Sequence, residues 1–299
     1  MYKLKGSIVA LVTPMESNGN IAWQSLFDLI DWHVESGTSG LVLVGTTGES
    51  ATIDVAEHVQ IIEQSSKHAK ERIPIIAGTG ANSTKEAIYL TSAAKKAGAD
   101  AALLVTPYYN KPSQEGLLAH YLEIANQVDI PQILYNVPAR TGCDLLPETV
   151  LNLSTHKNIV GLKEATGDMS RLEDLKEVLG NQITNESFLL YSGDDPTAMQ
   201  FILNGGSGTI SVTANIVPTE IAEICNLALQ GRSKEVIPLN AKLEQLNKFL
   251  FIESNPIPVK WMLYKLGKIP SGLRLPLTTL NSKYHHKMEI LLQELSLLK

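Results

Sequence analysis

Apolar runs alternate with amphipathic segments from Ser7 to about Gln230. Eight short runs of aliphatic and β-branched residues predict strands buried on both faces, since such strands lack the usual apolar–polar alternation. Between these runs, apolar residues recur three and four positions apart, as at Leu26, Leu29 and Ile30, which predicts amphipathic helices. The predicted strands cover residues 7–12, 41–44, 73–77, 101–105, 133–136, 159–163, 188–191 and 209–212.

Signals for helix starts follow several of these runs. Asp54 with Glu57, and Ser83 with Glu86, have the spacing of a capping box, in which each side chain bonds the other residue's backbone N–H group. Further helices are predicted to begin near residues 113, 147, 171, 196 and 218. Beyond residue 230 only helices are predicted, over 236–251, 256–266 and 278–298.

Eight successive strand–helix units predict an α/β fold of the (β/α)8 TIM barrel type. An open doubly wound sheet is the alternative, because periodicity does not show closure, although no Gly-rich dinucleotide fingerprint follows the first strand. We therefore predict a catalytic barrel over residues 1–230 and a C-terminal helical extension over 231–299. The extension is expected to pack on the barrel or on another subunit.

The sixth predicted strand ends on a lysine, in the run Ile-Val-Gly-Leu-Lys-Glu-Ala at 159–165. Strand alternation places Val160 and Leu162 on one face and Gly161 and Lys163 on the other. If both faces are buried, the amine favours its neutral form, and a neutral lysine is a good Schiff-base nucleophile. The alternative is a solvated lysine at a strand end, which is common.

Functional residues of TIM barrels lie at the carboxyl ends of the strands and in the loops beyond them. The segment Gly-Thr-Thr-Gly at 45–48 can present N–H groups and hydroxyls to a carboxylate, or can be a plain turn. Tyr135 can shuttle protons or simply fill the barrel, and Arg140 can clamp a carboxylate or form a surface salt bridge. Tyr108 and Tyr109 are adjacent in a proline-flanked loop, so one of them can face a partner chain.

Composition narrows the function classes. The net charge of −6 is spread among interspersed charges, which argues against nucleic-acid or membrane partners. Cys143 and Cys225 are the two cysteines, which suits a reducing compartment rather than a disulfide framework. No signal-like or membrane-length apolar run is present, so we predict a cytoplasmic protein. The seven histidines form no spaced ligand set, so we expect neither a metal nor another cofactor.

Three of these motifs together resemble the dihydrodipicolinate synthases, a family of the class I aldolase superfamily of pyruvate-dependent lyases. They are Gly-Thr-Thr-Gly-Glu at 45–49, Tyr-Asn-Val-Pro-Ala-Arg-Thr-Gly at 135–142 and Gly-Leu-Lys-Glu at 161–164, and the likeness runs nearly end to end. The resemblance implies condensation of pyruvate with L-aspartate-4-semialdehyde to 4-hydroxy-tetrahydrodipicolinate, the committed step of the diaminopimelate route to L-lysine.

The resemblance also implies a role for each rim residue. Lys163 would form the imine with pyruvate, and Tyr135, Thr46 and Tyr109 would relay protons, with Tyr109 acting in a neighbouring subunit's site. The substrate-binding residues would be Thr47 for the pyruvate carboxylate, Arg140 for the semialdehyde carboxylate, Ile210 lining the pyruvate pocket and Gly193 bounding it.

Three alternatives remain beside this function. Sialic acid lyases share the lysine and the tyrosine but carry Gly-Ser-Thr-Gly-Glu after strand two and usually lack the arginine, so Thr46 and Arg140 favour the synthase. Other aldolases of sugar acids, such as keto-deoxy sugar acids, are the next competitor. A barrel without catalysis, serving as a lysine-binding or structural oligomer, would have lost Lys163, Tyr135 or Thr46.

The resemblance further implies a homo-oligomer, either a tetramer built as a dimer of dimers or a dimer, with L-lysine as a feedback inhibitor at a dimer interface. Val55 stands where strongly inhibited relatives often have a polar or basic residue, so we expect at most moderate inhibition. The implied allosteric residues are Ser50, Ala51, His58, Asn82, Glu86 and Tyr108.

Overall fold

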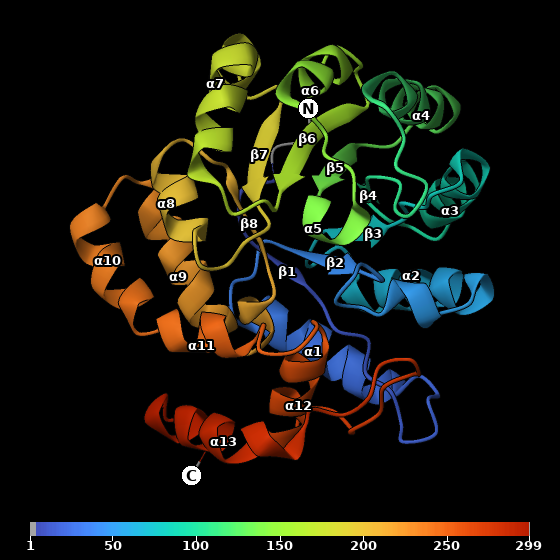
Figure 1. Ribbon diagram of the computed structural model, residues 1–299. Coiled ribbons are helices and arrows are strands. Elements are labelled where there is room, and N and C mark those ends of the chain that lie inside the picture. Colours follow the sequence, from blue (N-terminus) through green and yellow to red (C-terminus); the bar gives the residue numbers. More distant parts are fainter. Residues whose placement is uncertain (1–3, 299) are drawn as a thin grey trace.

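Eight parallel strands form a closed barrel in sequence order, with β1 paired to both β2 and β8 (Figure 1). The computed structural model describes residues 4–298. The predicted TIM barrel is confirmed. The strands are β1 (Gly6–Ala10), β2 (Gly40–Leu43), β3 (Ile75–Gly78), β4 (Ala101–Val105), β5 (Gln132–Asn136), β6 (Ile159–Glu164), β7 (Leu189–Ser192) and β8 (Gly208–Ser211).

Helices surround the barrel as an outer layer (Figure 1). Their buried residues recur at helical spacing, as Leu172, Leu175 and Leu179 do on α7, so each helix has an apolar face toward the strands. These helices are α1 (Trp23–Glu35), α2 (Val55–Ala69), α3 (Thr84–Lys96), α4 (Gln114–Gln127), α6 (Pro147–Leu153), α7 (Met169–Thr184), α8 (Ala198–Leu203) and α9 (Pro218–Leu229). The single turn α5 (Pro138–Thr141) and the 3₁₀ turns η1 (Ser50–Thr52) and η2 (Thr213–Asn215) follow the ends of β5, β2 and β8.

The two predicted capping boxes have different outcomes. Asp54 caps α2, because its carboxylate accepts a hydrogen bond from the Glu57 N–H at 2.9 Å. The Glu57 side chain does not reach back, since it pairs with the Arg274 guanidinium at 2.6 Å. Ser83 makes no side-chain capping bond, so the capping box with Glu86 is wrong.

The face assignment at the start of β6 is also wrong. The register between β5 and β6 pairs Gln132 with Ile159 and Ile133 with Gly161, which leaves Val160 as an extra residue. This β-bulge turns Val160 toward the barrel interior, whereas Leu162 packs in the helix layer. Sequence alternation alone does not reveal the inserted residue.

The C-terminal segment beyond α9 is helical as predicted, but its helices are shorter. The expected helix over 236–251 is divided into α10 (Ser233–Ala241) and α11 (Glu244–Phe249), because Lys242 and Leu243 donate to carbonyls three residues back and tighten the turn. Next come α12 (Ile257–Lys265), η3 (Ser282–Tyr284) and α13 (His285–Glu294), so the helix predicted from residue 278 begins later.

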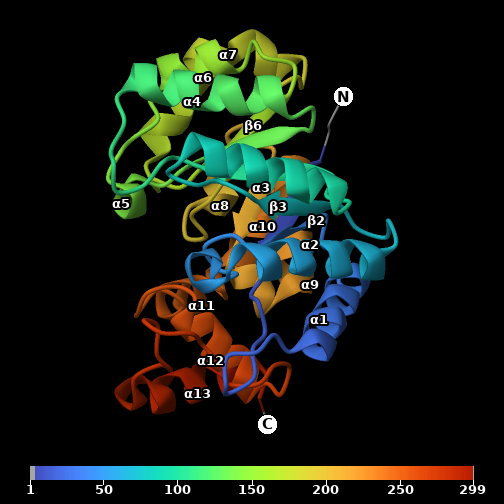
Figure 2. The same cartoon turned by 90° about the vertical axis from the view of Figure 1, so that its right-hand side faces the viewer.

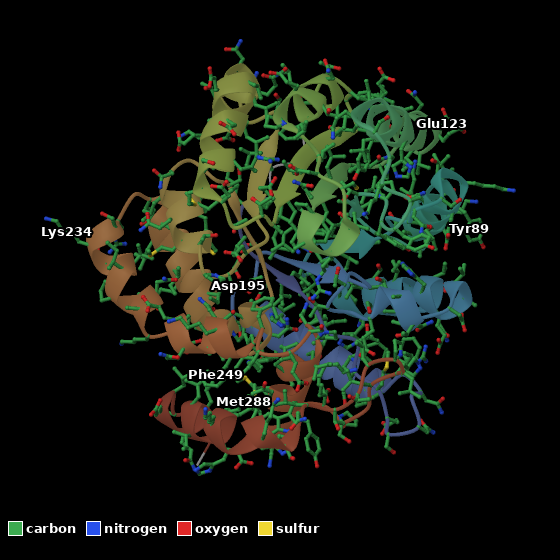
Figure 3. All side chains as sticks on the ribbon, viewed as in Figure 1. Tyr89, Glu123, Asp195, Lys234, Phe249 and Met288 are labelled. Atoms are coloured by element: carbon green, nitrogen blue, oxygen red, sulfur yellow. The ribbon has the colours of Figure 1, made fainter. Side chains whose placement is uncertain are left out.

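The C-terminal helices lie on one side of the barrel, beside α1 and α9 (Figures 1 and 2). Phe249 on α11 and Met288 on α13 lie close together in Figure 3, and both pack in a cluster that also holds Leu11 and Val12. The segment therefore shares apolar core with the barrel. Among residues 4–298, no helix combines the length and the apolar character that a membrane span requires.

Candidate active site

A cavity of about 210 Å³ opens at the carboxyl ends of the strands. In Figure 2 this end of the barrel carries α5 and lies opposite the N-terminus. Apolar side chains of the first, second and fourth strands, Ala10, Val42 and Leu103, form part of its wall. Six residues predicted from the sequence also line it: Thr46, Thr47, Tyr135, Arg140, Lys163 and Gly193.

Lys163 reaches this cavity from the end of β6. Its residue is 5% exposed, and its Nζ lies 4.2 Å from the ring centroid of Tyr135. The strand register explains the proximity, because Tyr135 on β5 is paired with Lys163 on β6. A nucleophilic amine and a phenol thus face one small space that is largely shielded from water.

Gly193 leaves the space that the Lys163 side chain occupies. A Cβ at this position would come within 2.7 Å of Lys163 Cε and of Ala165 Cβ, which is closer than real Cβ contacts allow. The Gly193 N–H donates to the Glu164 carbonyl at 2.7 Å, so its backbone also holds the end of β6. The glycine is required by the close approach of the lysine.

The Thr46–Thr47 loop is held by buried polar contacts. The Thr47 hydroxyl accepts a hydrogen bond from the Asn255 amide at 2.9 Å. Glu49 forms a fully buried ion pair with Lys260, whose ammonium also donates to the Thr13 carbonyl at 2.9 Å. Burial lowers the pKa of Lys260, and the charge of Glu49 opposes this effect. The C-terminal segment therefore fixes the loop that carries both threonines.

Arg140 belongs to α5, a single helical turn between β5 and α6. Its side chain is exposed and lines the cavity, and its Nη2 donates to the Asn255 carbonyl at 3.4 Å. Among residues 4–298 the guanidinium makes no further hydrogen bond, so its remaining donors can bind an anion at the mouth of the cavity. The arrangement suits a carboxylate that enters after the deeper part of the cavity has been filled.

Two predicted residues lie outside the cavity wall. Ile210 is buried in the barrel interior, in the same cluster as Tyr135. Tyr109 is 89% exposed, with a positive φ of 75°, and its phenol is not directed into the cavity of its own chain. The loop that carries it is anchored by the Tyr109 N–H, which donates to the Thr141 carbonyl at 3.3 Å.

Asn255 is the residue of this site that sequence reasoning missed. It lines the cavity and contacts both Thr47 and Arg140, while its Oδ1 is buried without a hydrogen-bond partner among residues 4–298. It lies in the loop before α12, about 90 residues after the motif Gly-Leu-Lys-Glu at 161–164. The one signal in the sequence is the proline-rich run Asn-Pro-Ile-Pro at 255–258, which marks a loop before a helix.

The implied allosteric residues lie outside the cavity. Asn82 donates to the Tyr108 carbonyl at 3.2 Å, and burial together with the charge of Glu86 raises the pKa of Tyr108. Burial lowers the pKa of His58 to about 4, and its Nε2 has no hydrogen-bond partner among the described residues. Ser50 begins η1, followed by Ala51, which is exposed.

Within residues 4–298, no three His, Cys, Asp or Glu side chains are grouped so that they could hold a metal ion. The polar groups that line the cavity are the amine of Lys163, the phenol of Tyr135, the guanidinium of Arg140, threonine hydroxyls, the Asp194 carboxyl and the Asn255 amide.

Comparison with known proteins agrees with this chemistry. The sequence matches the Dihydrodipicolinate synthetase family over residues 3–295. It is 55% identical over 291 residues to the 4-hydroxy-tetrahydrodipicolinate synthase of Pseudomonas savastanoi pv. phaseolicola, covering 97% of this chain and 98% of that protein. The corresponding synthase of Alcanivorax borkumensis is 55% identical over 296 residues, covering 99% of each.

Solved structures give the same result. The chloride-inhibited dihydrodipicolinate synthase of Acinetobacter baumannii, crystallised with pyruvate, has a TM-score of 0.95 and 52% identity, covering 99% of this chain and 100% of that one. The lysine-bound enzyme of Cyanidioschyzon merolae has a TM-score of 0.94 and 34% identity, covering 100% of both chains. The chain described here therefore belongs to the dihydrodipicolinate synthetase family.

Proposed function

We propose that this protein is a lyase that condenses pyruvate with L-aspartate-4-semialdehyde to 4-hydroxy-tetrahydrodipicolinate. The observation that carries the proposal is the buried Lys163 amine beside the Tyr135 ring, in a small cavity at the carboxyl end of the barrel. The family supports it, because its members named above are 4-hydroxy-tetrahydrodipicolinate synthases and one was crystallised with pyruvate. Thr46 and Arg140 favour this reaction over that of a sialic acid lyase.

The proposed reaction begins at Lys163. Its neutral amine attacks the keto carbon of pyruvate, and loss of water gives a protonated imine. The imine withdraws electrons, so a methyl proton leaves and an enamine forms. The enamine carbon then adds to the aldehyde of the second substrate. Finally, the amino group of that substrate attacks the imine carbon, closes the six-membered ring and releases Lys163.

Proton transfer is assigned to hydroxyls at the rim. Tyr135 and Thr46 would exchange protons with the imine and the new alkoxide, and Tyr109 of a neighbouring subunit would connect them to solvent. In support, Tyr135 and Thr46 line the cavity, whereas Tyr109 is exposed outside its own chain's cavity.

Substrate binding is assigned to the two ends of the cavity. Thr47 would hold the pyruvate carboxylate, with Gly193 and the buried Ile210 limiting the space for its methyl group. Arg140 would bind the carboxylate of the semialdehyde at the mouth, where its side chain is exposed.

Oligomer and regulation follow from the same assignment. A site that uses Tyr109 of another chain requires at least a dimer, and we propose a dimer or a tetramer built as a dimer of dimers. We further propose that L-lysine inhibits the enzyme at most moderately, at a site formed by Ser50, Ala51, His58, Asn82, Glu86 and Tyr108. The relative that was crystallised with lysine bound supports a lysine site, and Val55 argues against strong inhibition.

We also propose a domain boundary at residue 230 and a cytoplasmic location. The boundary falls between α9 and α10, and residues 231–299 would act as an extension of the barrel that fixes the Thr46–Thr47 loop. The free, buried thiols of Cys143 and Cys225 suit a reducing compartment.

Substrate choice is tested by turnover. We expect pyruvate with L-aspartate-4-semialdehyde to be consumed, and N-acetylneuraminate and keto-deoxy sugar acids to be cleaved at least about 10³-fold less efficiently. Efficient cleavage of a sugar acid, with no condensation of the semialdehyde, would contradict the proposed function.

A further inference from the structure

Asn136 and Glu164 follow the two proposed catalytic residues of β5 and β6 by one position each. The strand register pairs Tyr135 with Lys163 and, directly after them, Asn136 with Glu164. Because neighbouring side chains on a strand point to opposite faces, the first pair faces the cavity and the second pair faces the helix layer. The second pair therefore lies immediately behind the first.

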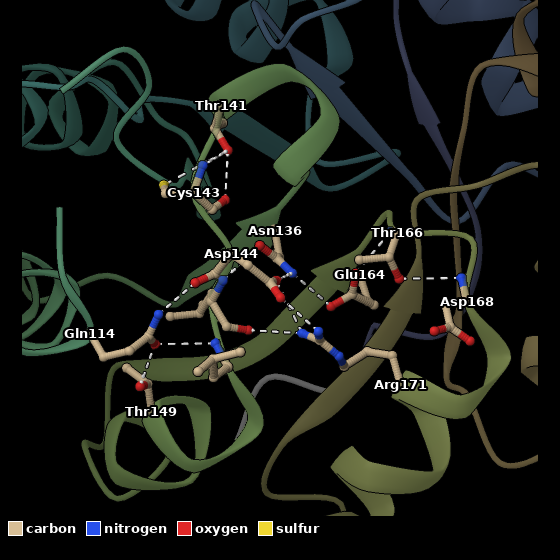
Figure 4. Close-up of polar contacts among 12 residues, drawn as sticks. Gln114, Asn136, Thr141, Cys143, Asp144, Thr149, Glu164, Thr166, Asp168 and Arg171 are labelled. Atoms are coloured by element: carbon tan, nitrogen blue, oxygen red, sulfur yellow. Dashed lines mark hydrogen bonds and ion pairs between the residues drawn. The ribbon is translucent and has the colours of Figure 1, made fainter. Parts of the chain in front are cut away.

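The side chains of the second pair join the two strands. The Asn136 amide donates to Glu164 Oε2 at 3.0 Å, and both residues are buried, with exposures of 0% and 3%. The other oxygen, Glu164 Oε1, accepts from the Thr166 N–H at 2.8 Å. Figure 4 shows this link between the strand ends.

A second layer of contacts holds Asn136 in one orientation. Its Oδ1 accepts from the Leu145 N–H at 3.0 Å, so its Nδ2 must face the two carboxylates of Asp144 and Glu164. Arg171 grips both oxygens of Asp144, at 3.1 and 2.7 Å (Figure 4). All hydrogen-bonding groups of the Asn136 side chain are thus used, which fixes its rotamer.

The charges of this network are unequal. Burial opposes ionisation of Asp144, but hydrogen bonds from Arg171 and Asn136 outweigh it and lower the pKa of Asp144. Burial raises the pKa of Glu164, whose hydrogen bonds from Asn136 and Thr166 oppose the shift only in part. Placing a costly carboxylate behind the reactive lysine is unnecessary for packing alone, since an apolar residue would fill the same space.

We propose that the Asn136–Glu164 link is a positioning device that fixes the spacing between Lys163 and Tyr135. Neither residue touches substrate in this account. Cutting the link lets the carboxyl ends of β5 and β6 shift relative to each other, and a displacement of about 1 Å between reacting groups lowers a rate by about 100-fold. The inference rests on the proposed function, because it assigns the spacing to imine chemistry.

Glu164→Ala and Glu164→Gln form the central pair of variants. Glu164→Ala removes the link, so we expect kcat and the rate of borohydride-trapped imine formation to fall about 10- to 100-fold, with KM for pyruvate nearly unchanged. Glu164→Gln retains an acceptor for the buried Asn136 amide, and its NH2 group then faces the half-buried Thr166 in place of the oxygen that accepted from the Thr166 N–H. It is expected to keep kcat within about threefold of the native value.

Asn158→Ala is the matched control. Asn158 is also buried, lies at the opposite end of β6 and donates two hydrogen bonds, to the Ala125 and Val128 carbonyls at 3.1 and 3.4 Å. Asn158→Ala and Asn136→Ala should lower the unfolding free energy by similar amounts. Only Asn136→Ala should slow imine formation.

The outcomes separate the two proposals. If native protein forms no imine on Lys163, the proposed function fails. If native protein does, but Glu164→Ala and Asn136→Ala trap pyruvate at the native rate, the positioning role alone is wrong. A matching loss of kcat in Asn158→Ala would also overturn it. If neither linking variant folds, the link supports the barrel itself, and that result contradicts a positioning role.

Discussion

The two tyrosines assigned to proton transfer lie in regions of opposite character. Tyr135 lies one residue before the end of β5, is 7% exposed and has Lys163 against its ring, while Tyr109 lies on a loop and is 89% exposed. The first region is closed by strand pairing and by buried polar contacts behind it. The second is held by the Asn82 side chain, which donates to the Tyr108 carbonyl, and by the Tyr109 N–H, which donates to the Thr141 carbonyl, and the Tyr109 side chain is exposed.

This difference teaches how the site is divided. One chain contributes Lys163, Thr47 and Tyr135 to a single cavity, so under the proposed assignment the imine-forming part of the site is complete within one barrel. The relay toward solvent is left open at the Tyr109 loop. In the proposed mechanism, fast proton transfer therefore requires a second chain, whereas imine formation does not.

Lys163→Ala removes the proposed nucleophile from the imine-forming part of the site. We expect this substitution to lower turnover more than any other. We predict a loss of kcat of about 10⁴-fold or more, because no other amine lines the cavity among the described residues. Turnover measured on protein with native thermal unfolding is the test. Retention of more than a few per cent of the native rate would contradict the assignment.

Tyr109→Phe tests the proposed proton relay at the exposed Tyr109 loop. Loss of one proton-transfer group is expected to lower kcat about 100-fold, while borohydride trapping of pyruvate stays near native. Mixing unfolded Tyr109→Phe and Lys163→Ala chains before refolding should restore about a quarter of native activity, since mixed dimers carry one intact site. If the mixture regains nothing, Tyr109 acts within its own chain or not at all.

Arg140→Ala should separate the two substrates. Removing a charged hydrogen-bond donor is expected to raise KM for the semialdehyde about 10- to 100-fold, with pyruvate imine formation unchanged. Steady-state kinetics with each substrate varied in turn provides the measurement. If imine formation with pyruvate fell by the same factor, Arg140 would act in imine formation and not in binding the semialdehyde.

Gly193→Ala perturbs the lysine through space. The added methyl group would lie 2.7 Å from Lys163 Cε, so the side chain must shift, and imine formation is expected to slow about 10-fold. Gly180→Ala is the control, because it lies within α7 with open space at its Cβ position. It should leave activity unchanged and stabilise the protein by about 0.5–1 kcal/mol.

The last prediction concerns stability in acid rather than activity. Burial lowers the pKa of His33 to about 3, so between its ordinary value near 6.5 and that pKa the unfolded chain binds more protons than the folded one. The unfolding free energy should therefore fall with decreasing pH by up to about 1.4 kcal/mol per unit from this residue. His33→Gln should reduce that slope, while His286→Gln at the exposed surface should not; equal slopes in all three proteins would refute the claim.

Much of the barrel was predictable from local patterns. Strands buried on both faces give continuous apolar runs, and all eight were found within a few residues of their bounds. The bulge at Val160 and the break after Ala241 were missed, because each depends on how the backbone pairs rather than on residue type.

The site was predictable where it follows the strands. Lys163, Tyr135 and Thr47 could be placed from strand ends, which meet at one rim in any parallel barrel. Asn255 could not, because its contact with Thr47 spans 208 positions in the chain. Asn136 and Glu164 were visible only as members of motifs, since their mutual bond requires the register of two strands.

The central claim is that one chain by itself completes the imine-forming half around Lys163. The most direct measurement is borohydride reduction of Tyr109→Phe protein with and without pyruvate, followed by mass analysis of the peptide that contains Lys163. We predict a pyruvate-derived mass on Lys163 at near-native yield. Its absence from that residue, in this variant or in native protein, would contradict the account.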